Sequence, residues 1–155
     1  MRTARQLSIF LLATLGISSL FSGYQMISDP TGNSLGLPFY LLNGSAFSDY
    51  SLPGWVILGT VGVFSFVIIL SIIKKIKTYS FLIILQGVII CILIFLQMIL
   101  LSETFVIQYV SLILGGALIG LGALQYQRRI AVEAELKANP QVAPKTHHHK
   151  HRKHK

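Results

Sequence analysis

The feature that most constrains this chain is a set of four long blocks without a charged residue. They cover Leu7–Ile27, Leu52–Ile73, Thr78–Ser102 and Thr104–Gln127. A helix needs roughly 20 apolar residues to cross about 30 Å of hydrocarbon, and each block reaches that length. Because the bilayer interior offers no water, a crossing segment must satisfy its backbone N–H and C=O groups within a helix. The sequence therefore predicts an all-α fold, an integral membrane bundle of four helices.

The composition argues against a water-soluble domain. Hydrophobic residues make up 53% of the 155 residues and charged residues 12%, whereas soluble domains carry about 25% charged residues. We expect the first block to be a retained span rather than a cleaved signal peptide, because its apolar run is long and no small-x-small cleavage pattern follows it.

The positive charges predict the orientation of the chain. All thirteen Lys and Arg residues precede the first block, separate the second from the third, or follow the fourth. The other two connections hold only acidic charges, at Asp29, Asp49 and Glu103. The positive-inside rule assigns the basic segments to the cytoplasmic side. We therefore expect a multi-pass protein of the cytoplasmic membrane with both termini in the cytoplasm.

Turn and charge signals divide the chain into three parts. Spans are expected at 7–27, 54–73, 79–101 and 105–126. Together they form a transmembrane domain of residues 1–127. Residues 128–138 are predicted to extend the last helix into the cytoplasm. Asn139-Pro140 ends this extension, and 139–155 is predicted to be a disordered tail rich in His and Lys.

Short turns make neighbouring spans antiparallel, the second with the third and the third with the fourth. A turn centred on Glu103 places Gly87 at the level of Gly120 and Ile119. Small residues let helices approach closely in lipid, so we expect Gly87 near Gly116 or Gly120. The candidate packing residues on these two spans are Gln86, Gly87, Gln97, Gln108, Gly115, Gly116 and Gly120.

Two glutamines of the third span share one face of the helix. Gln86 and Gln97 are three helical turns apart, and an amide that faces lipid is costly, so this face should point inward. We expect Gln97 near Gln108 or Tyr109. The glutamines suit either a hydrogen-bonding role between helices or a path for a polar ligand.

The first outer loop, residues 29–50, is too long for a minimal turn and too apolar for a linker. Pro38 can begin a short helix and Asn43-Gly44 can end it. The sequence therefore predicts a short interfacial helix near 36–43 that caps the bundle. We also expect backbone amides to hold Asp29 and Asp49.

Oxygen-bearing side chains on the outer side form a candidate ligand or interaction site. They are Asp29, Asn33, Ser34, Asp49, Tyr50 and Glu103. Such oxygens can bind a hard cation such as calcium, although the spacing matches no EF-hand. The alternative is that Asp29 and Asp49 cap turns and helix starts.

The tail is the second candidate site. It holds every histidine of the chain: His147, His148, His149, His151 and His154. Clustered imidazoles bind zinc, nickel or copper, and the interspersed cations attract anionic lipid. A third possibility is a solvated tail that only enforces topology. Nucleic acid is not an expected partner, because only the positive charge of the tail would favour it and the sequence has no fold signal for nucleic-acid binding.

No strong catalytic motif occurs in the chain. No span carries an ionisable group near its centre, and CxxC, HExxH and P-loop patterns are missing from the sequence. The lone Cys91 excludes a disulfide within the chain. We therefore expect no catalytic residues and no cofactor.

The leading hypothesis is an interaction or accessory subunit that binds another membrane protein or a second copy. The alternative is a small carrier or binding protein for an apolar or lipid-like ligand. A membrane enzyme ranks third.

The outer loop also resembles a known pattern. Asp29-Pro30, Gly32, Ser34-Leu35-Gly36-Leu37-Pro38, Asp49-Tyr50 and Pro53-Gly54 are similar to a loop of small uncharacterised bacterial membrane proteins with four spans. The layout is also similar to that of DoxX-like proteins. The resemblance implies a bacterial four-span protein and supplies no reaction.

Overall fold

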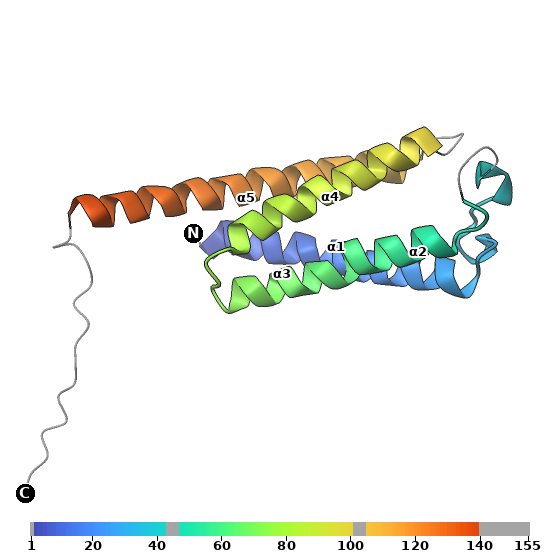
Figure 1. Ribbon diagram of the computed structural model, residues 1–155, viewed down its shortest axis with the longest axis horizontal. Helices are drawn as coiled ribbons and strands as arrows, with labels where there is room; N and C mark the ends of the chain where they lie inside the picture. Colours follow the sequence, from blue (N-terminus) through green and yellow to red (C-terminus); the bar gives the residue numbers. More distant parts are fainter. Residues whose placement is uncertain (1, 43–46, 101–104, 140–155) are drawn as a thin grey trace, which may run out of the picture.

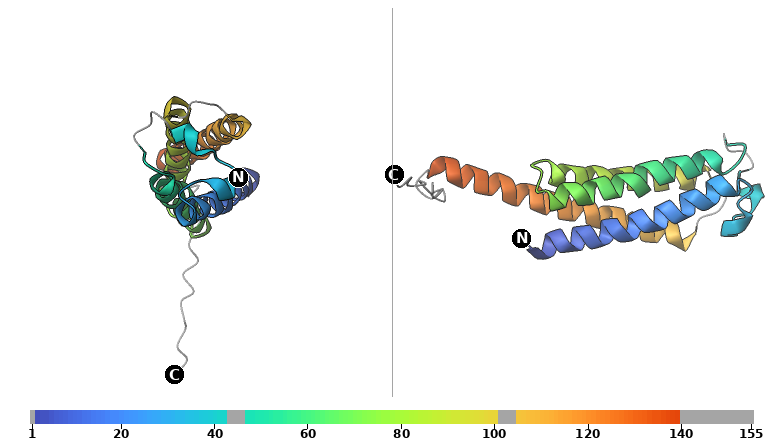
Figure 2. Two further views of the ribbon diagram at one scale, coloured as in Figure 1. Left: turned by 90° about the vertical axis from the view of Figure 1, so that its right-hand side faces the viewer. Right: turned by 90° about the horizontal axis from the view of Figure 1, so that it is seen from below.

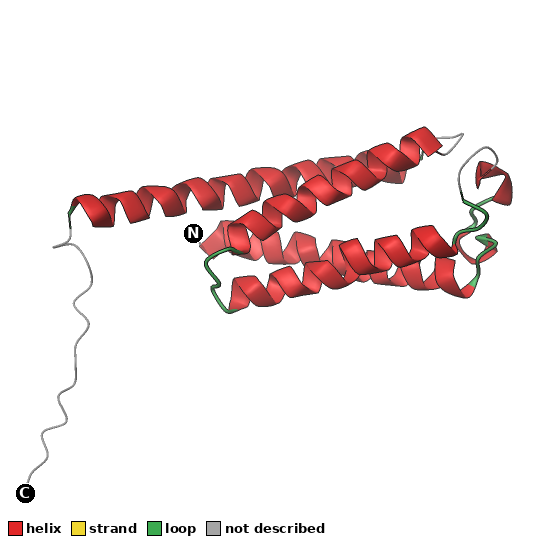
Figure 3. Cartoon of the chain, viewed as in Figure 1, coloured by secondary structure: helices red, strands yellow, loops and turns green. Residues whose placement is uncertain are grey.

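The computed structural model describes residues 2–42, 47–100 and 105–139, and this part of the chain is helical without strands (Figure 3). Its main helices are α1 (Arg2–Ser28), α2 (Ser51–Ile57), the π-helical turn η3 (Leu58–Val63), α3 (Phe64–Ile73), α4 (Tyr79–Leu100) and α5 (Val106–Ala138). α2, η3 and α3 follow one another without a break and form one spanning helix, Ser51–Ile73. Four helices in this part of the chain are long and apolar enough to cross a membrane, which confirms the predicted four-span fold.

The helices pair into two hairpins that lie side by side (Figures 1 and 2). α1 packs against the Ser51–Ile73 helix to form the first hairpin, and α4 packs against α5 to form the second. The hairpins meet where α1 contacts α5 and α3 contacts α4. All four spans contribute to the hydrophobic core, which comprises Leu12, Val61, Ile68, Ile72, Ile83, Ile90 and Leu118.

The two ends of the bundle differ in charge. The N-terminus, the link between α3 and α4, and the last turns of α5 lie at one end (Figure 1). We call it the basic end; its described cations include Arg5, Lys74, Lys75, Lys77, Arg128 and Arg129. Residues 29–42 and 47–50 lie at the opposite, or loop, end. One continuous helix, α5, covers both the expected fourth span and the expected extension; its 33 residues measure about 50 Å.

Glycines bring the two helices of the first hairpin into backbone contact. A Cβ on Gly23 would lie 2.8 Å from the carbonyl oxygen of Gly54, and a Cβ on Gly62 would lie 2.8 Å from the side chain of Leu20. Gly54 and Gly62 are eight residues apart, one too many for two α-helical turns. The π turn between them takes up that extra residue, because its hydrogen bonds run from i to i+5. Both glycines therefore face α1.

Two sets of hydrogen bonds cap the C-terminus of α3, which lies at the basic end of the bundle. Lys75 adopts a left-handed conformation with φ of 53°, and the N–H of Ile76 donates to the carbonyl of Ser71 at 3.0 Å, as in a Schellman motif. The guanidinium of Arg5 donates to the carbonyls of Ile72 and Ile73. α1 is thereby attached to the negative end of the α3 dipole.

In the second hairpin, the predicted depth at which α4 and α5 residues meet is confirmed, but the predicted face of α5 is not. A Cβ on Gly87 would lie 2.7 Å from Ile119 and 2.6 Å from the carbonyl oxygen of Gly115. The prediction that Gly116 or Gly120 faces Gly87 is wrong: a Cβ at either position would meet nothing within 4 Å. Gly115 and Gly116 point about 100° apart around the axis of α5. The position of the turn between α4 and α5 determines which residues lie at the same depth, but it does not determine how α5 is rotated about its axis.

Candidate functional site

Tyr50 organises the described part of the outer loop. It is 4% exposed; its N–H donates to the carbonyl of Pro30 at 3.0 Å, and its hydroxyl donates to the carbonyl of Pro38 at 3.1 Å. Gly32 lies beneath the ring with φ of 80°, so that a Cβ there would lie 2.7 Å from the ring. The loop is therefore folded around this side chain. Burial raises the pKa of Tyr50, as does the neighbouring Tyr40.

Backbone amides hold both loop carboxylates, as predicted. The carboxylate of Asp29 accepts hydrogen bonds from the N–H of Thr31 at 3.2 Å and from that of Ser34 at 2.8 Å. Asp49 accepts from the N–H of Ser51 at 2.9 Å, where α2 begins. Hydrogen bonds from the Thr31 hydroxyl and then the Ser34 amide lower the pKa of Asp29. Both aspartates thus stabilise turns and a helix start.

The predicted short helix differs in kind from the structure. Instead of a helix near 36–43, the loop contains the short 3₁₀ turns η1 (Asn33–Leu35) and η2 (Phe39–Leu42), and Gly36 follows the first turn with φ of 64°. Among the described residues, no group of three His, Cys, Asp or Glu side chains is placed to hold a metal. Glu103 and the five tail histidines lie outside the described residues.

Buried polar side chains lie where the two hairpins meet. The Nε2 of Gln86 on α4 donates to the hydroxyl of Ser65 on α3 at 3.3 Å. The Nε2 of Gln125 on α5 donates to the hydroxyl of Ser8 on α1 at 2.9 Å. Gln86 thus forms an interhelical hydrogen bond, which is one of the two roles that the sequence left open for it. The sequence did not single out Gln125, Ser8 and Ser65 as contact residues. A signal was present for Gln125, because it is a glutamine inside an apolar block.

The other two predicted glutamines behave differently. Gln108 is buried, and its Oε1 accepts from the N–H of Phe105 at 3.1 Å. Gln108 therefore caps the start of α5. Gln97 is half-buried, and its proximity to Gln108 or Tyr109 stays a prediction.

Three buried polar atoms have no hydrogen-bond partner within the described part of the chain. They are Ser80 Oγ, Gln86 Oε1 and Gln125 Oε1. Buried acceptors are rarely left unpaired, because desolvation is then uncompensated. Of the three, Gln125 also lines a cavity.

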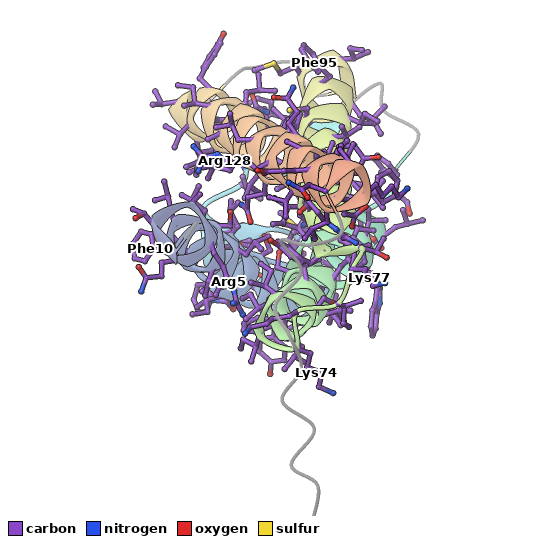
Figure 4. All side chains as sticks on the ribbon, turned by 90° about the vertical axis from the view of Figure 1, so that its left-hand side faces the viewer. Arg5, Phe10, Lys74, Lys77, Phe95 and Arg128 are labelled. Carbon is purple, nitrogen blue, oxygen red and sulfur yellow. The ribbon has the colours of Figure 1, made fainter. Side chains whose placement is uncertain are left out.

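This cavity opens at the basic end between α1, α4 and α5 and has a volume of about 310 Å³. Ala4 and Tyr79 line it from α1 and α4, and Leu124, Gln125, Arg128 and Val132 line it from α5. The wall is mostly apolar. In Figure 4, which views the bundle from this end, Arg128 lies between α5 and α1, whereas Arg5 points toward α3.

The two arginines of the cavity differ in their partners. Arg129 also lines it, and its Nε donates to Glu133 at 3.0 Å. Arg128 has no ion-pair partner among the residues that the structure describes. Glu133 lines the cavity as well, so the cavity combines the unpaired cation of Arg128, the ion pair between Arg129 and Glu133, and a mostly apolar wall.

A different surface is left open on the membrane-embedded part of α5. Gly116 and Gly120 are exposed, and Ile113, one turn earlier, is 71% exposed. By contrast, a Cβ on Gly122 would lie 3.0 Å from the carbonyl oxygen of Ser80. The same helix thus has one glycine-bearing side in contact with α4 and one that is unoccupied.

The cavity and the open α5 surface are the two candidate sites of the described chain. Their residues offer groups for binding: hydrogen-bonding atoms, cations and apolar contact area. Comparison with protein families, with curated proteins and with solved structures finds no match to this chain.

Proposed function

We propose that this protein binds a phospholipid-like amphiphile in the cavity at its basic end. The observation that carries the proposal is Arg128, a cation that has no ion-pair partner in the described chain and lines a mostly apolar cavity. An amphiphile matches this combination. Its anionic head can pair with Arg128, and its chains can lie on Leu124, which is on the hydrocarbon side of Arg128.

The depth of the cavity supports this proposal. The apolar part of α5 begins at Val106, and about 20 residues further along the helix cross the hydrocarbon. The boundary therefore falls near Gln125, and Arg128 lies at the level of lipid phosphates. By the positive-inside rule this is the cytoplasmic leaflet.

Lipid binding to the purified full-length protein tests the proposal. Native mass spectrometry in mild detergent would compare phosphatidylglycerol, which is anionic, with zwitterionic phosphatidylcholine of the same chains. We expect wild type to prefer the anionic lipid, and Arg128→Gln to weaken its binding about tenfold, because a charge-assisted hydrogen bond is lost.

Lys137→Gln is the matched control, because it removes the same charge from α5 outside the cavity lining. This variant should bind like wild type. An equal loss in both variants would mean that lipid responds to net charge alone, and the cavity would not be the site.

A second function, that of an interaction subunit, is favoured by the open side of α5 with Gly116 and Gly120. We propose a second copy as the partner, because a GxxxG contact needs small residues on both helices and a copy supplies them. Gly120→Leu should abolish a dimer seen by crosslinking in membranes while leaving the fold intact. Gly122→Leu, on the side against α4, should instead unfold the hairpin. A dimer that persists in Gly120→Leu would contradict this proposal.

A further inference from the structure

The groups that line the cavity follow a definite order along α5. Leu124 comes first from the hydrocarbon side, Arg128 follows, and Glu133 comes last. At 1.5 Å per residue, Glu133 lies about 7.5 Å beyond Arg128 along the helix axis. With Arg128 at the level of the lipid phosphates, this carboxylate lies on the water side of that level. The cavity therefore offers apolar surface, a cation and an anion in the order from hydrocarbon to water.

Glu133 can accept a further hydrogen bond. Its Oε1 accepts from the Nε of Arg129 at 3.0 Å, and this carboxylate has no other partner in the described part of the chain. The side chain is 55% exposed, so a ligand in the cavity can reach it. An ionised carboxylate accepts hydrogen bonds through both oxygens and cannot donate. Oε2 is therefore open to a donor, and a cationic donor forms the stronger bond with it.

We infer, building on the proposed function, that the bound amphiphile is a phospholipid with a primary ammonium in its headgroup, of the phosphatidylethanolamine type. Its chains lie on Leu124, its phosphate pairs with Arg128, and its ammonium donates to Glu133. The headgroup then carries charges opposite to those of the cavity, in the same order. Two carbons join its phosphate to its ammonium, and the long side chains of Arg128 and Glu133 reach it from either end. Arg129 stays bound to the same carboxylate.

The same residues disfavour a choline headgroup. A trimethylammonium group has no N–H to donate, so it cannot form a hydrogen bond to Glu133. Proteins bind quaternary ammonium groups with cages of aromatic rings instead. Among the described residues that line the cavity, Tyr79 is the one aromatic, and a single ring does not make a cage. Phosphatidylcholine has the same net charge as phosphatidylethanolamine, so a comparison of the two isolates the headgroup donor.

Native mass spectrometry titrations of the full-length protein would compare these two lipids with the same chains. Wild type should bind phosphatidylethanolamine about two- to fivefold more tightly, as expected for an ion pair at a half-exposed carboxylate. Glu133→Gln should remove this difference. That variant also frees Arg129, but the freed cation acts on both zwitterionic lipids, so the ratio of their affinities is the readout. Glu135→Gln, the matched control, removes the same charge from α5 outside the cavity lining and should keep the difference.

A lipid series gives a second measurement that needs no variant. Phosphatidyl-N,N-dimethylethanolamine is nearly as bulky as phosphatidylcholine but keeps one N–H. It should bind like phosphatidylethanolamine. If it binds like phosphatidylcholine, headgroup size rather than the N–H sets the affinity, and the inference is wrong.

The remaining outcomes decide between the two claims. Equal binding of phosphatidylethanolamine and phosphatidylcholine to wild type would overturn the ammonium and leave the proposed function standing on the loss of binding in Arg128→Gln. A preference that persists in Glu133→Gln, or one that is also lost in Glu135→Gln, would overturn the role of Glu133. Glycerophosphoethanolamine has the same headgroup without chains and should not compete. If it competes as well as the lipid does, the ligand is not an amphiphile and the proposed function falls.

Discussion

A methyl group at Gly87 should separate α4 from α5. The Cβ of Gly87→Ala would lie 2.6 Å from the carbonyl oxygen of Gly115 and 3.0 Å from the backbone nitrogen of Ile119. Backbone atoms cannot rotate away as a side-chain end can, so one helix has to shift. Overpacking of this kind costs about 1–3 kcal/mol.

Gly59→Ala is the matched control, because it makes the same substitution in open space and away from the proposed dimer contact. Alanine favours the helix over glycine by up to about 1 kcal/mol, and both variants share this gain. The difference between them therefore isolates the steric effect, and Gly87→Ala should be less stable than Gly59→Ala by about 1–3 kcal/mol.

Cys91 provides the assay. It is the single cysteine of the chain, and its sulfur would lie 2.9 Å from a Cβ on Gly115, at the α4–α5 contact. Maleimide labelling during a titration with sodium dodecyl sulfate would report when the helices separate. We expect Gly87→Ala to label at a lower mole fraction of detergent than wild type. Equal midpoints for the two alanine variants would refute the close approach at Gly87.

Three further predictions concern the basic and loop ends. Lys75→Gly should raise the free energy of unfolding by about 1 kcal/mol in the same titration, because glycine adopts the left-handed conformation without steric cost; an unchanged or lower stability would contradict this. Arg5→Gln should lower it by about 1–2 kcal/mol through loss of charged hydrogen bonds to the end of α3, and Lys74→Gln, the control, should not. The pKa of Asp29 is lowered in the folded protein, so the stabilisation by this carboxylate is present above the ordinary value of 3.8 and is lost as the pH falls through the lower folded value. Thermal unfolding should show this loss of stability at acid pH in wild type and not in Asp29→Asn. Equal acid sensitivity of the two proteins would contradict the prediction.

The sequence was sufficient for the spans because length and hydropathy decide them. Block lengths and short turns also fixed the depth of contacts, so that Gly87 was correctly placed opposite Ile119. The rotation of each helix about its axis is a different quantity. It depends on packing against all neighbours at once, which is why Gly115 rather than Gly116 faces α4.

Two features of the structure could not be predicted from the sequence, for related reasons. The π turn at Leu58–Val63 shifts the phase of its helix by one residue, so the alignment of Gly54 with Gly62 is hidden from a regular helical pattern. The bond between Gln125 and Ser8 joins residues that are 117 positions apart, and no local pattern connects them. The loop turns were easier, because Asp29 and Asp49 act on residues close to them in sequence.

The division into two hairpins has a consequence for how the chain is made. Each hairpin joins helices that are adjacent in sequence, so insertion into the membrane can proceed two spans at a time. The bond between Gln125 and Ser8 then links α5 with α1, and it forms only when the second hairpin packs against the first. The cavity is lined by α1, α4 and α5, so it does not exist before that step. A lipid bound in the cavity would therefore be added last, at the contact between two hairpins that have already formed.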